Sequence, residues 1–166
     1  MEISFEEYVA THLAPSSSAH EKPRILLLTC IDYRYAHRIV EVMDRRKLRG
    51  KYDMFSLAGV AAGANRNKIW RQTLVEHIRV ARKIKHPIDR LIVLEHRDCG
   101  AYKAFFGLEW SAVTPPVEAA SHEKQVRRLI KDLKKEFKKE IPNLRIDSFL
   151  LARDEDDVLH VEAPHP

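Results

Sequence analysis

The chain has 166 residues, with 29 lysines and arginines against 24 aspartates and glutamates, so its net charge is +5 with histidine counted neutral. A chain of this length buries roughly 70% of its unfolded surface, enough for one hydrophobic core. Hydrophobic residues make up 45% of the sequence, with only 5 glycines and 8 prolines, which excludes collagen-like, low-complexity and disordered classes. We therefore expect a single globular domain over residues 1–166, with residues 1–22 as a helical arm and linker.

The sequence contains no apolar run near the roughly 20 residues of a membrane helix, so we expect no membrane association. The N-terminus carries Glu2, Glu6 and Glu7 and lacks the basic start of a secretory signal. We therefore expect a cytoplasmic protein. In that reducing setting a pair of cysteines more often indicates a metal site or catalysis than a disulfide.

The first half of the chain predicts two strands and two helices. Residues 3–13 are expected to form a short helix, followed by a flexible connection over 14–18. The apolar run over 25–29 is typical of a strand buried on both faces. Helical spacing follows over 36–43 and should end near Gly50, and 54–58 is a second short strand. The small residues over 59–64 predict a loop whose backbone closely approaches another group.

The second half continues the alternation. Apolar spacing over 70–84 predicts a helix, and the apolar run over 91–95 predicts another buried strand. A loop over 107–121 is expected before a basic helix, and two closing strands over 146–151 and 158–161 should flank an acidic turn. Apolar strands that alternate with helices predict an α/β fold with a mainly parallel central sheet and helices on both faces.

The excess positive charge is concentrated in residues 122–140, which hold eight lysines and arginines and four acidic residues. Apolar residues recur there at helical spacing, which indicates that the charges lie on the solvent face of an amphipathic helix. Nucleic acid is an unlikely partner, because no aromatic residues alternate with the basic ones and no groove-reading motif appears. An acidic partner for this helix stays open as an alternative.

Both cysteines lie close to the end of a buried strand. Cys30 follows the first strand, while His96 and Cys99 follow the strand over 91–95. The carboxyl ends of parallel strands line the crevice where ligands bind, so the two segments can converge. Two thiolates and one imidazole suit Zn²⁺ in a tetrahedral site with one position left for water or another ligand. Alone, however, His-x-x-Cys is a weak signal, since a buried cysteine is usually a small hydrophobic residue.

The residues after Cys30 strengthen the metal hypothesis. Asp32 is close enough in sequence either to become a fourth ligand or to accept a hydrogen bond from water on the metal. Arg34 can fix the direction of that carboxylate through a bidentate pair.

Cys-x-Asp-x-Arg followed by His-x-x-Cys resembles the β-class carbonic anhydrases, and the stretch from Glu95 to Lys103 is similar to the family's sequence around its zinc ligands. The likeness covers residues 25–161, and the short length is similar to compact bacterial members, which include carbonyl sulfide hydrolases. The resemblance implies a zinc-dependent lyase that hydrates CO₂ to bicarbonate, as a homodimer or higher homo-oligomer.

The resemblance also implies the site. Zinc would lie on Cys30, His96 and Cys99, with Asp32 and Arg34 as the catalytic pair and Asp32 as the fourth ligand in a closed state. It places Gly59 and Gly100 at the substrate, with the N–H of Gly100 near a substrate oxygen. Because two thiolates already neutralise Zn²⁺, the ion should acidify its water less than in an all-histidine site, and a proton-handling Asp32 is then needed.

The chain departs from the family at one place. Ser56 and Leu57 stand where the family usually has Arg-Asn, before the retained Ala58-Gly59 pair. We expect a less polar wall there, which would suit COS or CS₂, or leave a zinc protein with little activity and a partner-binding basic helix.

The other histidines are not expected to bind metal. His77 is expected to be structural, while His37, His86 and His122 are expected to be surface side chains, each with the alternative of a proton relay.

Overall fold

The computed structural model describes residues 3–13, 24–45, 47–109, 114–153 and 159–162. The strands are β1 (Ile3–Ser4), β2 (Ile25–Thr29), β3 (Tyr52–Ser56), β4 (Arg90–His96), β5 (Arg145–Arg153) and β6 (Leu159–Glu162). The helices are α1 (Phe5–His12), α2 (Tyr33–Arg45), α3 (Val60–Arg66), α4 (Lys68–Lys83), α5 (Gly100–Phe106) and α6 (Pro115–Glu136).

The strands form one sheet in the order β1-β6-β5-β4-β2-β3. Strands β3, β2, β4 and β5 run parallel, whereas β6 is antiparallel to both of its neighbours, β5 and β1. The α/β class predicted from the sequence is confirmed. Strand β2 lies between β3 and β4, so the ends of β2 and β4 are adjacent at the carboxyl edge of the sheet.

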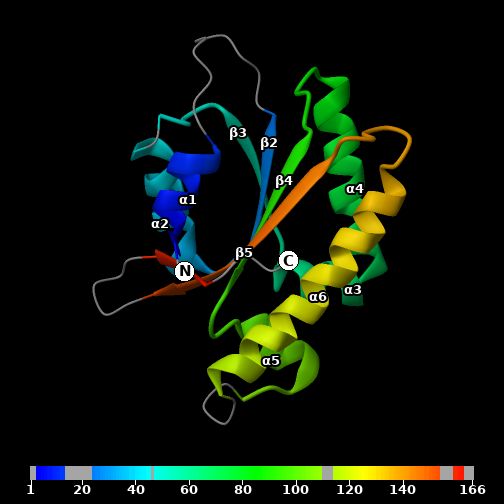
Figure 1. Ribbon diagram of the computed structural model, residues 1–166. Helices are drawn as coiled ribbons and strands as arrows, with labels where there is room; N and C mark the ends of the chain where they lie inside the picture. Colours follow the sequence, from blue (N-terminus) through cyan, green and yellow to red (C-terminus); the bar gives the residue numbers. More distant parts are fainter. Residues whose placement is uncertain (1–2, 14–23, 46, 110–113, 154–158, 163–166) are drawn as a thin grey trace.

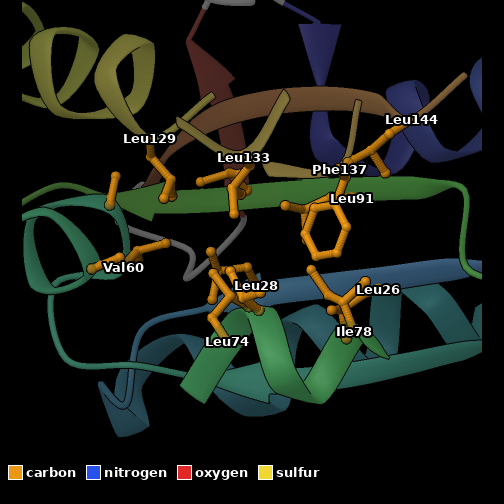
Figure 2. Close-up of a cluster of buried hydrophobic side chains, with 14 of the residues drawn as sticks. Leu26, Leu28, Val60, Leu74, Ile78, Leu91, Leu129, Leu133, Phe137 and Leu144 are labelled. Atoms are coloured by element: carbon orange, nitrogen blue, oxygen red, sulfur yellow. The ribbon is translucent and has the colours of Figure 1, made fainter. Parts of the chain in front are cut away.

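Helices cover both faces of the sheet, with α1 and α2 on one side and α3, α4 and α6 on the other (Figure 1). Alternate residues of β2 pack on opposite faces of the sheet. Leu27 packs in the cluster with α2, while Leu26 and Leu28 pack in the cluster with α3, α4 and α6. In Figure 2, leucines of β2 and β4 meet Leu74 of α4 and Leu133 of α6. This second layer contains α3 and α6, whose residues contact Glu95 beside His96.

The N-terminal helix predicted over 3–13 is confirmed as α1, preceded by the two-residue strand β1, which the sequence did not indicate. Val9 and Leu13 are buried in the same hydrophobic cluster as α2. The connection predicted over 14–18 and the acidic turn over 154–157 lie outside the described residues. No helix within the described ranges is long and apolar enough to cross a membrane.

The loop predicted over 59–64 is wrong, because helix α3 begins at Val60. Its small residues allow close packing instead. A Cβ on Gly63 would lie well inside 3.0 Å of the carbonyl oxygen of Ala58, a separation that real Cβ atoms essentially never show. The predicted close approach of the backbone is therefore present, but it joins a helix to the chain that leaves β3.

The loop predicted up to residue 121 is also too long, because α6 begins at Pro115. Pro115 and Pro116 occupy the first turn of the helix, where a missing N–H costs nothing. Helix α5 was not predicted, and α2 ends at Arg45 rather than near Gly50.

Candidate metal centre

Three potential metal ligands meet at the carboxyl edge of the sheet. Cys30 directly follows β2, His96 is the last residue of β4, and Cys99 precedes α5. Their donor atoms all lie within 4.8 Å of one another, and the two Sγ atoms are 3.9 Å apart. His96 and Cys99 are buried and Cys30 is half-buried. The convergence follows from the pairing of β2 with β4.

The imidazole of His96 is oriented for a cation. Its Nδ1 lies 2.8 Å from the carbonyl oxygen of Arg97 and donates to it, which leaves Nε2 as the ring nitrogen with a lone pair. Within the described part of the chain, this buried Nε2 has no hydrogen-bond partner. The ring also packs on Tyr35, with centroids 4.4 Å apart. A buried lone pair beside two sulfur atoms fits a zinc ion, because Zn²⁺ favours this donor set.

The two cysteines share their proton unequally. The contact with Cys99 lowers the pKa of Cys30 to about 4 against the opposing effect of burial, with help from His96 and from the N–H of Gly59, which lies 3.4 Å from Cys30 Sγ. The pKa of Cys99 is raised, because the Cys30 thiolate and burial both favour the neutral thiol. One thiolate is therefore available at neutral pH, and a bound cation would favour the second.

Asp32 and Arg34 form a bidentate pair beside these ligands. Arg34 Nη2 lies 2.7 Å from Asp32 Oδ2, Arg34 Nε lies 2.9 Å from Asp32 Oδ1, and the Arg34 backbone N–H also donates to Oδ1 at 3.0 Å. The hydrogen bonds from Arg34 lower the pKa of Asp32, although partial burial opposes them. Because Asp32 Oδ2 is 3.8 Å from His96 Nε2, an ionised carboxylate faces the three ligands.

The two glycines named from the sequence lie close to the cysteines, Gly59 with its N–H 3.4 Å from Cys30 Sγ and Gly100 directly after Cys99. Gly59 has a φ of 65°, and a Cβ there would lie 2.8 Å from Ala101 Cβ, so the position suits glycine alone. Gly100 is exposed at the start of α5 with open space around it. A contact of either residue with substrate remains a prediction.

The departure at Ser56 and Leu57 has a structural explanation. Ser56 Oγ lies 3.0 Å from the Thr29 hydroxyl, and Leu57 is buried in the core with α3 and α4. Leucine at this position therefore contributes to packing.

His122 is fully buried, so its expected surface position is wrong. The reason is the early start of α6, which carries His122 under β4. Its Nδ1 lies 2.8 Å from Glu95 Oε2. The other three histidines named from the sequence have ordinary partners: His86 Nδ1 lies 2.9 Å from Asp53 Oδ2, His77 Nδ1 lies 3.0 Å from the Thr73 carbonyl oxygen, and His37 Nε2 lies 3.1 Å from Glu41 Oε1.

Sequence reasoning gave no role to Glu95 or Glu118, although both are buried beside the ligands. A signal for Glu95 was present, because a carboxylate at the end of an apolar, doubly covered strand needs partners. Nothing in the sequence distinguished Glu118.

A mainly parallel sheet with a Cys-His-Cys group that could hold a metal ion and an aspartate-arginine pair at its carboxyl edge is the arrangement that the resemblance to the carbonic anhydrases implies. The comparison with protein families is in agreement: residues 20–149 match the family described as "Putative carbonic anhydrase". The match covers most of the chain, and the chain belongs to this family, which confirms the resemblance stated from the sequence.

The chain is also similar to proteins with no described activity. An uncharacterized protein of Rickettsia conorii is 29% identical over 131 residues, which is 78% of this chain and 67% of that protein. An uncharacterized protein of Rickettsia bellii is 29% identical over 131 residues, covering 78% and 76% respectively.

Among solved structures, tetrameric β-carbonic anhydrases from the filamentous ascomycete Sordaria macrospora have a similar fold. The TM-score is 0.50 at 15% identity, covering 81% of this chain and 77% of the fungal chain. At this identity the likeness supports the fold alone.

Proposed function

We propose that this protein is a zinc-dependent carbonic anhydrase, a carbonate dehydratase that interconverts CO₂ and bicarbonate. The observation that carries the proposal is the ionised Asp32, held by Arg34 and facing the Cys30, His96 and Cys99 donor atoms. Family membership and a β-carbonic-anhydrase fold support it.

Zinc would be held by Cys30, His96 and Cys99, and when bound it would supply Lewis-acid activation of a water molecule. Asp32 would orient a water molecule beside these three residues and accept a hydrogen bond from it, because its ionised carboxylate can only accept. Arg34 restrains Asp32 through both carboxylate oxygens. The N–H of Gly100, at the open start of α5, is placed in this proposal near a substrate oxygen.

The Asp32–Arg34 pair also affects whether Asp32 would itself become the fourth metal ligand. If Asp32 were to bind the metal itself, the metal would compete for its carboxylate oxygens with the hydrogen bonds that the Arg34 guanidinium and backbone N–H donate. Charge-assisted hydrogen bonds of this kind contribute about 1.5–3 kcal/mol each. We therefore propose that the open state, with Arg34 in contact, is the resting state at neutral pH.

The test is stopped-flow CO₂ hydration by zinc-loaded protein, with zinc content measured on the same samples. Cys30→Ser should lose both zinc and activity. Asp32→Asn should keep zinc but lose activity by about 10²-fold or more, the usual contribution of a proton-handling group. Asp53→Asn is the matched control, since Asp53 pairs with His86 away from the ligands. Equal rates in the wild type and both site variants would refute the mechanism.

Assays of the same samples also test the alternative reaction, hydrolysis of COS or CS₂ at the same site. Sulfide release with negligible CO₂ hydration would change the substrate but leave the ligands unchanged. If a zinc-loaded protein showed neither activity, the remaining alternative would be a zinc-binding protein whose basic helix binds an acidic partner.

We further propose a cytoplasmic homodimer or higher homo-oligomer. Ile31 and Tyr33, which flank Asp32, are 66% and 87% exposed, and in this proposal a second copy of the chain covers them. Sedimentation of the wild type beside Tyr33→Ser tests this: the wild type should exceed 19.3 kDa, and the variant should dissociate at higher concentration. A monomeric wild type would contradict it.

A further inference from the structure

Two buried carboxylates lie behind the metal ligands, outside the proposed reaction. Glu95 is 1% exposed and precedes His96 on β4. Its Oε1 accepts the N–H of Ala61 at 2.9 Å, and its Oε2 accepts from Tyr102 Oη at 3.3 Å and pairs with His122 Nδ1 at 2.8 Å. A charge buried at this depth is tolerated only when such partners surround it.

The second carboxylate lies one helical turn before His122. Glu118 is 6% exposed; its Oε1 accepts the N–H of Asp98 at 2.7 Å and lies 3.9 Å from His122 Nε2, while its Oε2 accepts from Arg97 Nη1 at 2.9 Å. His122 therefore stands between Glu118 and Glu95. Burial alone would lower the pKa of His122, but its contacts with these two carboxylates raise it.

Each carboxylate holds a strained turn. Val60 has a φ of 43° and Asp98 a φ of 53°, the left-handed region that non-glycine residues rarely adopt and that costs of order 1–3 kcal/mol. Glu95 accepts the amide that follows Val60, and Glu118 accepts the amide of Asp98 itself. Such conformations persist only when their surroundings fix them, and these two carboxylates do so.

Both turns contact the candidate site directly. The turn at Val60 includes Gly59, whose N–H donates to Cys30 Sγ. The turn at Asp98 connects His96 to Cys99, and its carbonyl oxygen accepts from Arg34 Nη2 at 3.0 Å. These contacts connect the two buried carboxylates, through the backbone of the two turns, to Cys30, to Cys99 and to the arginine that restrains Asp32.

We propose that Glu95, His122 and Glu118 are positioning residues, which hold the turns at Val60 and Asp98 in the conformation that brings Cys30 and Cys99 to one metal ion. The inference rests on the proposed zinc site and deepens it. None of the three residues touches the metal or substrate, and they act through the backbone of the two turns.

The first test measures zinc affinity by chelator competition. Glu118→Gln should weaken zinc binding by about 10- to 100-fold, the usual effect of losing a group that orients a ligand. Glutamine replaces one of the two acceptor oxygens by an NH₂ donor, so the contact with either the Asp98 amide or Arg97 is lost. Glu76→Gln, the same change in an exposed ion pair on α4, is the control and should leave affinity unchanged. Zinc affinity in Glu118→Gln within twofold of the wild type would overturn the proposal.

A rescue separates positioning from general destabilisation. Asp98→Gly removes the strain of the left-handed conformation at residue 98. Adding it to Glu118→Gln should therefore raise zinc affinity by at least tenfold. If Glu118 only docked α6, the double variant would bind zinc as weakly as Glu118→Gln, which would refute the role assigned to the turn. Should Glu118→Gln fail to fold, Tyr102→Phe, which removes one hydrogen bond to Glu95 at constant ring volume, should still weaken zinc binding several-fold, and unchanged affinity would refute the proposal.

A metal-free measurement makes the result independent of the proposed function. In zinc-free wild type, the amides of Ala61 and Asp98 should be protected from hydrogen exchange, and Glu118→Gln should lose at least tenfold of that protection at Asp98. Wild type that shows this protection but binds no zinc would contradict the proposed enzyme and leave the turn-holding role standing. Unprotected amides in the wild type would contradict the role itself.

Discussion

Replacing Gly63 by alanine tests the close packing of α3 against the chain leaving β3. In an unobstructed helix this change stabilises by about 1 kcal/mol, because alanine has the higher helix propensity. Here the added methyl group would overlap the carbonyl oxygen of Ala58 and approach Trp70 to 3.2 Å. The first obstacle is backbone and cannot rotate away, so the helix must shift.

The sign of the effect is therefore expected to reverse. Overpacking of this kind costs about 1–3 kcal/mol and occasionally more, and the overlap with backbone places Gly63 at the upper end. After subtracting the propensity gain, we expect a net loss of about 2 kcal/mol in the free energy of unfolding. Because α3 carries the amide that binds Glu95, zinc affinity should fall as well.

Urea unfolding followed by circular dichroism measures this loss directly. Gly100→Ala is the matched control, since it makes the same change at the start of another short helix, where a Cβ meets nothing within 4 Å. Gly63→Ala within about 0.5 kcal/mol of Gly100→Ala would show that the close contact is absent, and the packing of α3 would have to be reconsidered.

Two further predictions concern acid and metal. The pKa of Glu118 is held at about 2 because the nearby His122 and hydrogen bonds from Arg97 and the Asp98 amide outweigh its burial. Its contribution to the free energy of unfolding is therefore present above the unfolded value near 4.5 and lost as pH falls toward 2. Unfolding between pH 5 and pH 2 should show this loss, of about 2–3 kcal/mol, and its persistence in Glu118→Gln would contradict the assignment. Zinc at about 1,000 times its Kd should stabilise the fold by about 4 kcal/mol, as seen by calorimetry; an equal gain in Cys99→Ser would show that zinc binds elsewhere.

The parts of the fold that the sequence predicted are those with strong periodicity. The apolar runs of β2 and β4 and the spacing along α4 each specify an element without reference to the rest of the chain. The meeting of Cys30 with His96 was also foreseeable, because parallel neighbouring strands bring their ends together.

The missed features depend on contacts between distant segments. The small residues of α3 resemble a loop until the Ala58 carbonyl is seen against Gly63. Pro115 and Pro116 suggest a break, although at the first turn they begin a helix. The pairing of Glu95 with His122 spans 27 residues and joins a strand to a helix, so no local pattern reveals it.

The residues of the candidate site and the groups behind it leave the ribosome in the order of their positions in the chain. Cys30 is synthesised 66 residues before His96, so β3, α3 and α4 are all made before the second member of the Cys-His-Cys group appears. Glu118 and His122 emerge later still. The candidate metal site is therefore completed late in synthesis, and a nascent chain halted before residue 118 carries Cys30, His96 and Cys99 without Glu118 and His122, the groups proposed to position their turns.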